Sequence, residues 1–187
     1  MLIPLGFLAG SGGGVDSGFE LIRTEIISGS STSSVVFNVS SLASTYRHLQ
    51  IRFAARSTRS GEVVSNLNLR LNGATSGYFS HILDTSGGTT VRGVAGSLSY
   101  LYLSEWLPGA TGTSNAFLAG TIDLLDAFST TKNKTIRTLN GVPASVNAIA
   151  LNSGGWFNTS AITSIEFYDG FAPLLAGTRV SLYGIKG

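Results

Sequence analysis

The chain has 187 residues and no cysteine, which suits one domain, or one domain with an appendage, and excludes disulfides and thiolate metal sites. Charged residues make up only 12% of it, about half the usual share, and a hydrophobic share of 43% argues against a disordered chain. The net charge of +2 comes without a run of Lys or Arg, so we do not expect nucleic-acid binding.

The first 18 residues, MLIPLGFLAGSGGGVDSG, join an apolar stretch to a glycine-rich one. They contain neither the G-x-x-x-x-G-K-[ST] nor the G-x-G-x-x-G pattern, which excludes a phosphate-binding loop. No basic residue precedes Arg23, and Pro4 and Gly6 interrupt the apolar run, so the segment is a poor export signal. We therefore predict an arm over residues 1–18 that binds a partner through its apolar side chains: Leu2, Ile3, Leu5, Phe7 and Leu8.

Two placements of this arm stay open. Fully extended, 18 residues reach about 60 Å, whereas a compact domain of this size has a radius of gyration of roughly 16 Å. The arm can therefore cross a neighbouring subunit, or it can fold back over its own sheet.

Hydrophobic alternation follows from residue 19 onward. In HLQIRFAAR, the apolar side chains of Leu49, Ile51 and Phe53 alternate with polar ones, as on a half-buried strand. NLNLRLNG alternates in the same way and ends in Asn72–Gly73, which predicts a hairpin-type turn, and TRVSLYGI predicts a strand near the end of the chain. Further strand candidates are residues 19–27, 34–39, 78–83, 97–105, 116–125, 134–139, 146–152 and 162–168.

No segment keeps a helical period, although SSLASTYRHL can hold one short turn capped by Ser40 or Ser41. About ten short strands without intervening helices favour an all-β fold, an antiparallel β-sandwich of the jelly-roll kind. We predict that it forms one domain over residues 19–187.

The densest basic stretch, YRHLQIRFAARSTRSG, contains Arg47, Arg52, Arg56 and Arg59. A solvated strand face followed by a turn explains this stretch better than an anion-binding patch.

Catalytic and metal-binding patterns are weak. His48 and His81 stand 33 residues apart, and Asp123 and Asp126 should face opposite sides of a strand. There is no G-x-S-x-G motif, so we predict no enzyme, no catalytic residue, no metal ligand and no cofactor. Calcium binding by scattered Asp and Asn side chains in loops stays open.

Trp106 and Trp156 lie at predicted strand–loop junctions. Exposed, they could stack on a sugar ring or anchor an interface. Packing in the core is the preferred interpretation for each of them.

Five segments spread along the chain carry a family resemblance: MLIPLGFLAGSG, VSSLASTYRHLQIRFAARS, LNLRLNG, GGWFNTSAITSIEFY and GTRVSLYGIKG. On these segments the chain resembles small all-β virion proteins of tailed bacteriophages, including phages of marine and freshwater bacteria. The resemblance implies a jelly-roll-like virion component without enzymatic activity, and it assigns no binding residue.

We therefore expect a structural protein that decorates or cements the capsid, using its arm and sheet edges. Its expected partners are the major capsid protein, or another virion protein, and further copies of itself, as in a homotrimer. Its expected location is the virion, assembled in the host cytoplasm, and neither a membrane nor nucleic acid is an expected partner. The alternative is a tail fibre, collar or baseplate adsorption protein that recognises host-surface glycan.

Overall fold

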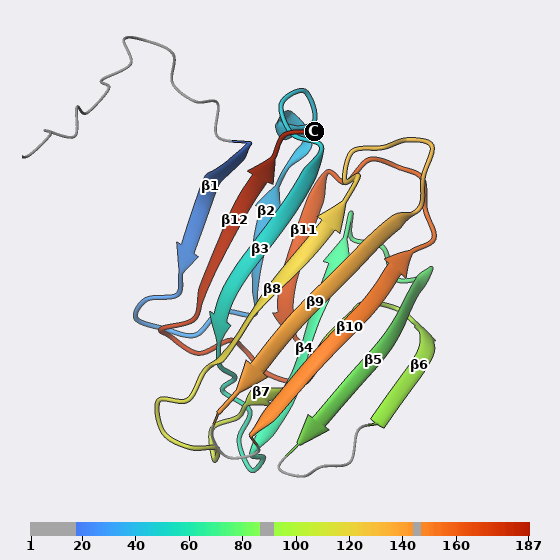
Figure 1. The fold of residues 1–187 in the computed structure, drawn as a ribbon. Coiled ribbons are helices and arrows are strands. Elements are labelled where there is room, and N and C mark those ends of the chain that lie inside the picture. The colour runs from blue at the N-terminus through green and yellow to red at the C-terminus, as the bar shows by residue number, and fades with distance from the viewer. Residues whose placement is uncertain (1–17, 87–91, 144–146) are drawn as a thin grey trace, which may run out of the picture.

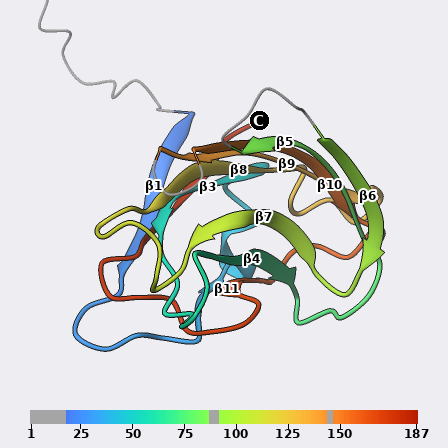
Figure 2. The ribbon, with the colours of Figure 1, turned by 90° about the horizontal axis from the view of Figure 1, so that it is seen from below.

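The computed structural model describes residues 18–86, 92–143 and 147–187, which form two antiparallel β-sheets packed as layers (Figures 1 and 2). The larger sheet has the strand order β1-β12-β3-β8-β9-β10-β5-β6, and the smaller has the order β2-β11-β4-β7. The strands are β1 (Phe19–Ile26), β2 (Ser34–Asn38), β3 (His48–Ala55), β4 (Val64–Leu71), β5 (Tyr78–Ser86), β6 (Arg92–Leu98), β7 (Leu101–Pro108), β8 (Leu118–Leu125), β9 (Lys134–Val142), β10 (Ala148–Trp156), β11 (Ser164–Asp169) and β12 (Arg179–Ile185).

Eight of these strands form a jelly roll. Its two four-stranded sheets are β1-β12-β3-β8 and β2-β11-β4-β7, so the predicted all-β antiparallel sandwich is confirmed. The other four strands are two inserted hairpins, β5–β6 and β9–β10. They continue the larger sheet past β8 as β9-β10-β5-β6, and we call these four strands the extension (green and orange in Figure 1).

The core lies between the two layers, where one face of most strands is buried. On β3, Leu49 and Ile51 are fully buried and Phe53 is nearly so, as their alternation predicts. The ring of Phe53 lies 5.2 Å, centroid to centroid, from that of Phe167 on β11, which joins the two sheets.

Polar side chains of the extension cover β7, an edge strand of the smaller sheet. Asn152 donates its side-chain N–H to the carbonyl of Tyr102, and Asn140 donates to the carbonyl of Leu103 at 3.0 Å. The amide of Tyr102 donates to the Ser80 hydroxyl at 3.3 Å. These bonds satisfy backbone groups that an edge strand would otherwise leave open to pairing with another chain.

The prediction of one continuous strand over residues 97–105 is wrong. The chain instead forms β6 and β7, which belong to different sheets, and it crosses between them at Ser99 and Tyr100. Alternation reports which side chains share a face and does not reveal that a chain changes sheets between them.

The predicted turn at Asn72–Gly73 forms, but it makes no hairpin. Both residues have positive φ, 53° and 66°, and the amide of Ala74 donates to the carbonyl of Leu71 at 2.9 Å. β4 and β5, which the turn connects, lie in different sheets. The Asn72 side chain accepts the amide of Thr163 at 2.8 Å, which fixes the turn to the segment before β11 instead.

The short turn predicted after β2 is a 3₁₀ helix over Ser40–Leu42. Its N-cap is Val39, and no side chain caps it, so the expected cap by Ser40 or Ser41 is wrong.

Candidate functional site

The outward face of the extension carries apolar side chains where polar ones are expected. β9 and β10 alternate strictly between buried and exposed positions over most of their length. Their inward members include Ile136 and Ala150, whereas Leu139 and Leu151 point away from the core. The solvent face of an antiparallel sheet is normally polar, so exposed leucines at these positions mark a surface with another role.

The outward apolar side chains form one continuous patch. Leu151 on β10 lies directly opposite Leu83 on β5 and Leu139 on β9. Side chains at such opposite positions have Cβ atoms about 4.5–5.5 Å apart, so the three leucines form a row across the sheet. With Ile149, which precedes Leu151 by two residues on the same face, they make up what we call the outer patch. The exposed fractions are 53% for Leu83, 50% for Leu139, 53% for Ile149 and 49% for Leu151.

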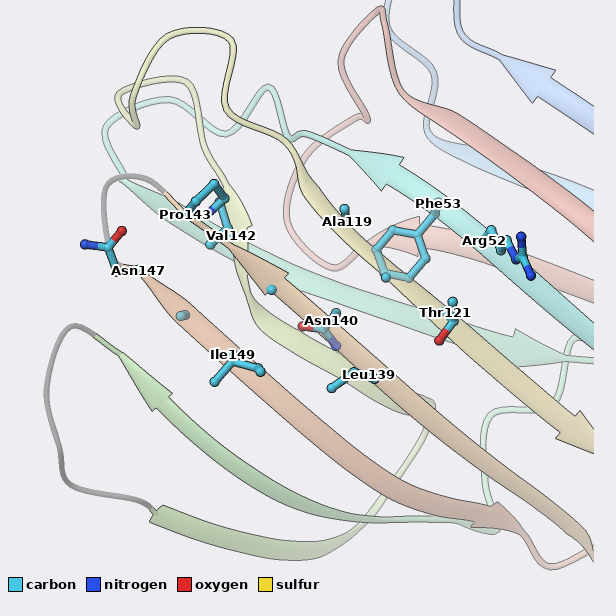
Figure 3. A pocket seen from close by; sticks show the side chains of 13 residues that line it. Arg52, Phe53, Ala119, Thr121, Leu139, Asn140, Val142, Pro143, Asn147 and Ile149 are labelled. Atoms are coloured by element: carbon cyan, nitrogen blue, oxygen red, sulfur yellow. The ribbon is translucent and has the colours of Figure 1, made fainter.

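An open hollow of about 730 Å³ lies beside this row (Figure 3). Gly141 on β9 stands directly between Ile149 on β10 and Ala119 on β8. Because Gly and Ala fill so little space, the sheet surface is lower here than at the neighbouring Leu139. The outer patch is therefore bordered by a hollow that can receive a side chain.

The remaining half of the same sheet face, on β8, β3 and β12, is polar. Gln50 donates to the Asp123 carboxylate at 2.8 Å. The Arg52 guanidinium lies 5.0 Å from the ring centre of Phe19 and 4.9 Å from that of Tyr183, and these two rings stack on each other. All four side chains of the outer patch therefore lie on strands added to the jelly roll, and β1, at the far edge of the same sheet, separately exposes Leu21 and Ile26.

The outer patch is too small to hold a free partner by itself. Fully burying a Leu or Ile side chain stabilises by about 1.5–3 kcal/mol, so burying the exposed halves of four such side chains contributes about 4 kcal/mol in all. Association of two free molecules costs about 4–15 kcal/mol. The patch can therefore act only together with a second attachment.

The predicted partner-binding residues lie outside the described residues. These are Leu2, Ile3, Leu5, Phe7 and Leu8. Their role stays a prediction from the sequence.

The structure argues against the alternative in which Trp156 is an exposed anchor. Its side chain is only 3% exposed and stacks on Tyr78, with ring centres 6.0 Å apart, so its ring face is closed to a sugar. Trp106 is half-buried against the core and donates its ring N–H to the Asp84 carboxylate at 3.1 Å. Core packing, the interpretation preferred from the sequence, holds for Trp156.

Arg56 does not lie on a solvated strand face. It is 5% exposed, and its guanidinium donates to four backbone carbonyls of the loop between β7 and β8. The acceptors are Thr113 at 2.5 Å, Ala116 at 3.0 Å, Gly109 at 2.9 Å and Gly112 at 3.1 Å. This arginine is a clamp on the loop, and the sequence carries no signal that separates it from its exposed neighbours.

The charged side chains around Asp126 form structural ion pairs. Asp126 accepts hydrogen bonds from Lys132 and Arg47, each at 2.7 Å, and these bonds lower its pKa from 3.8 to about 2. Asp123 makes its own bond to Gln50 and does not pair with Asp126. Across residues 18–86, 92–143 and 147–187, no three His, Asp or Glu side chains converge as metal ligands would.

No protein-family model, curated protein or solved structure matches the chain. Among the described residues, no helix has the length and apolar character needed to span a membrane. The outer patch is the candidate functional surface of the described residues.

Proposed function

We propose that this chain is a structural protein of a bacteriophage virion that decorates or cements the capsid surface. The resemblance of its segments to small all-β virion proteins supports this role. The jelly roll is consistent with it, since viral capsid proteins use that fold, but lectins and cupins use it too. The fold alone therefore does not select the function.

The observation that carries the proposal is the outer patch. A row of half-exposed leucines on the outward face of a sheet is unfavourable for a protein surrounded by water, and it is useful for one that lies against other protein. Only 12% of the residues are charged, which lowers the cost of covering much of the remaining surface.

Attachment in this proposal works by burial of apolar area. The outer patch of a copy supplies a contact of about 4 kcal/mol with one neighbour, and its apolar side chains within residues 2–8 supply a contact with another neighbour. Two weak contacts on one molecule reinforce each other, because binding of the first holds the second at high local concentration. The partners are the major capsid protein, or another virion protein, and further copies of this chain, for which a trimer is our expectation.

A tail protein that binds glycan has less support. That alternative used Trp106 and Trp156 as stacking platforms, and the ring of Trp156 is buried between the sheets. Counting copies per virion separates the two roles, because a shell decoration is present in many copies and a tail component in few.

The proposal is tested by rebinding the purified protein to phage particles that lack it. Removal of residues 1–17 and, separately, Leu151→Asp should each strongly lower the number of bound copies. Val63→Asp is the matched control, because Val63 is 42% exposed and precedes β4 in the other layer. Full occupancy with both altered proteins, or no binding of the wild-type chain to any particle, would overturn the proposal.

A further inference from the structure

We propose that the outer patch is the receiving surface for residues 2–8 of a neighbouring copy, so that copies join head to tail by exchanging these segments. This inference rests on the proposed function and names the partner of the patch. Four observations carry it: the size of the patch, the apolar composition of residues 2–8, the distance from β1 to the patch, and the exposed apolar side chains on β1.

The size of the patch favours a tethered occupant. Its four half-exposed side chains amount to an area on the order of 200–300 Å². A stable interface between free proteins buries about 800 Å² on each partner. A segment that is tethered to a neighbouring copy can bind with much less buried area, because the tether holds it at high effective concentration.

The chemistry of residues 2–8 matches the patch. The segment reads LIPLGFL and contains no charged side chain. It offers four aliphatic side chains and one aromatic one to a surface of three leucines, one isoleucine and an apolar hollow. The polar half of the same sheet face, with Arg52 and Asp123, offers no comparable surface.

The length of the connection favours a neighbouring copy over the same chain. Nine residues, 9–17, separate the segment from Gly18, and a Gly/Ser-rich linker of nine residues spans about 17 Å on average. Strands in a sheet lie about 4.8 Å apart. Within one copy, β10 stands five strand spacings from β1, about 24 Å away, so the linker would have to stretch well beyond its average span, to about three-quarters of its full length.

A neighbouring copy can bring its patch closer. β1 and β6 are the two edges of the larger sheet and lie at its opposite ends (Figure 1). If β1 of one copy lies beside β6 of the next, the neighbour's β10 is only three strand spacings from β1, about 14 Å. This distance matches the average span of the linker. The contact is heterologous, and it closes into a ring when the rotation between copies allows.

The surface of β1 supports its role as an edge against another copy. Leu21 and Ile26 are 56% and 58% exposed, and both lie on this strand. Leu21 also flanks the irregularity at which the pairing of β1 with β12 shifts register. Covering Leu21 adds apolar contact near the point from which the exchanged segment departs, and covering Ile26 adds it at the other end of β1.

Cysteine cross-linking tests the inference directly, because the chain has no cysteine of its own. A tagged Phe7→Cys protein is mixed with an untagged Leu151→Cys protein and oxidised mildly. We expect a disulfide-linked heterodimer several-fold more abundant than in the matched mixture of Phe7→Cys with Val63→Cys. Leu151 is half-exposed, so its replacement should not unfold the protein, and circular dichroism of each variant checks this.

The double variant Phe7→Cys/Leu151→Cys distinguishes the two placements of the segment. Exchange between copies gives linked dimers and larger species, whereas docking on the same chain gives only internally linked monomer. The monomer-only result, or a heterodimer yield no higher than the control, overturns the inference. If cross-linking fails while the wild-type chain still decorates particles, only the inference fails; if cross-linking succeeds while decoration fails, only the proposed function does.

Discussion

Arg56→Met should destabilise the domain strongly, because it removes a buried guanidinium that four backbone carbonyls share. Leaving a buried hydrogen-bonding group unpaired costs about 1–3 kcal/mol. Taking the low end for each carbonyl, since water can reach part of this loop, gives about 4 kcal/mol. Burying the charged guanidinium has a desolvation cost that the neutral Met side chain avoids. This saving offsets part of the loss, so we expect a net destabilisation of about 3 kcal/mol.

Thermal unfolding followed by circular dichroism measures the effect. For a domain of 150–250 residues, 1 kcal/mol shifts Tm by about 2–4 °C, so Arg56→Met should lower Tm by about 6–12 °C. Arg56→Lys keeps the positive charge and has three N–H donors, so its Tm should lie between those of the wild type and Arg56→Met. Arg52→Met is the control, because Arg52 is exposed and lies over two rings, a contact worth about 0.5–1 kcal/mol. A Tm for Arg56→Met no lower than that of Arg52→Met would refute the reasoning.

Three further predictions concern other parts of the molecule. The folded-state pKa of Asp126 lies below its ordinary value, so its bond with Lys132 should stabilise the protein above about pH 4 and lose effect as the pH falls towards 2. Wild type and Asp126→Asn, compared by urea unfolding, should therefore differ at pH 7 and converge near pH 2; a constant difference would contradict this. Gly120→Ala should lower the free energy of unfolding by about 1–3 kcal/mol in the same assay, because the new Cβ would lie 2.6 Å from the Cβ of Asn140 on the neighbouring strand. An unchanged midpoint would show that β8 and β9 can move apart there without cost. Asn140→Ala should lower the free energy of unfolding by about 1–3 kcal/mol, because the carbonyl of Leu103 loses its hydrogen bond. It should also speed amide hydrogen exchange in β7. Unaltered exchange would show that β7 does not depend on this hydrogen bond.

The sequence predicts the strands of the jelly roll well where polar and apolar side chains alternate cleanly. On β3, Leu49, Ile51 and Phe53 are separated by Gln50 and Arg52, so one face is unambiguous and lies in the core. Local pattern and turn chemistry carry this information. They do not reveal which strands pair, as Asn72–Gly73 shows by connecting two different sheets.

The outer patch was not predicted, because β10 is apolar on both faces along part of its length. Ile149 and Leu151 alternate with Ala148 and Ala150, and hydrophobicity alone assigns the larger pair to the core. The structure does the reverse, with the alanines buried and the larger side chains exposed. On the buried face of β10, Ala148 and Ala150 leave room for β7 and for its hydrogen bonds with Asn140 and Asn152. This packing requirement arises only when strands distant in the sequence meet.

The pairing of β1 with β12 has a consequence for how the protein is made. Residues 19–26 are synthesised early, yet their only sheet neighbour among the described strands is residues 179–185. Until those residues have been translated, β1 has no strand to pair with, and the larger sheet lacks the strand that joins β1 to β3. Folds built from such distant pairings form slowly, and nascent chains with unpaired strands are prone to aggregate. Yield in the cell should therefore depend on translation rate and chaperone supply more than on the final stability of the sandwich.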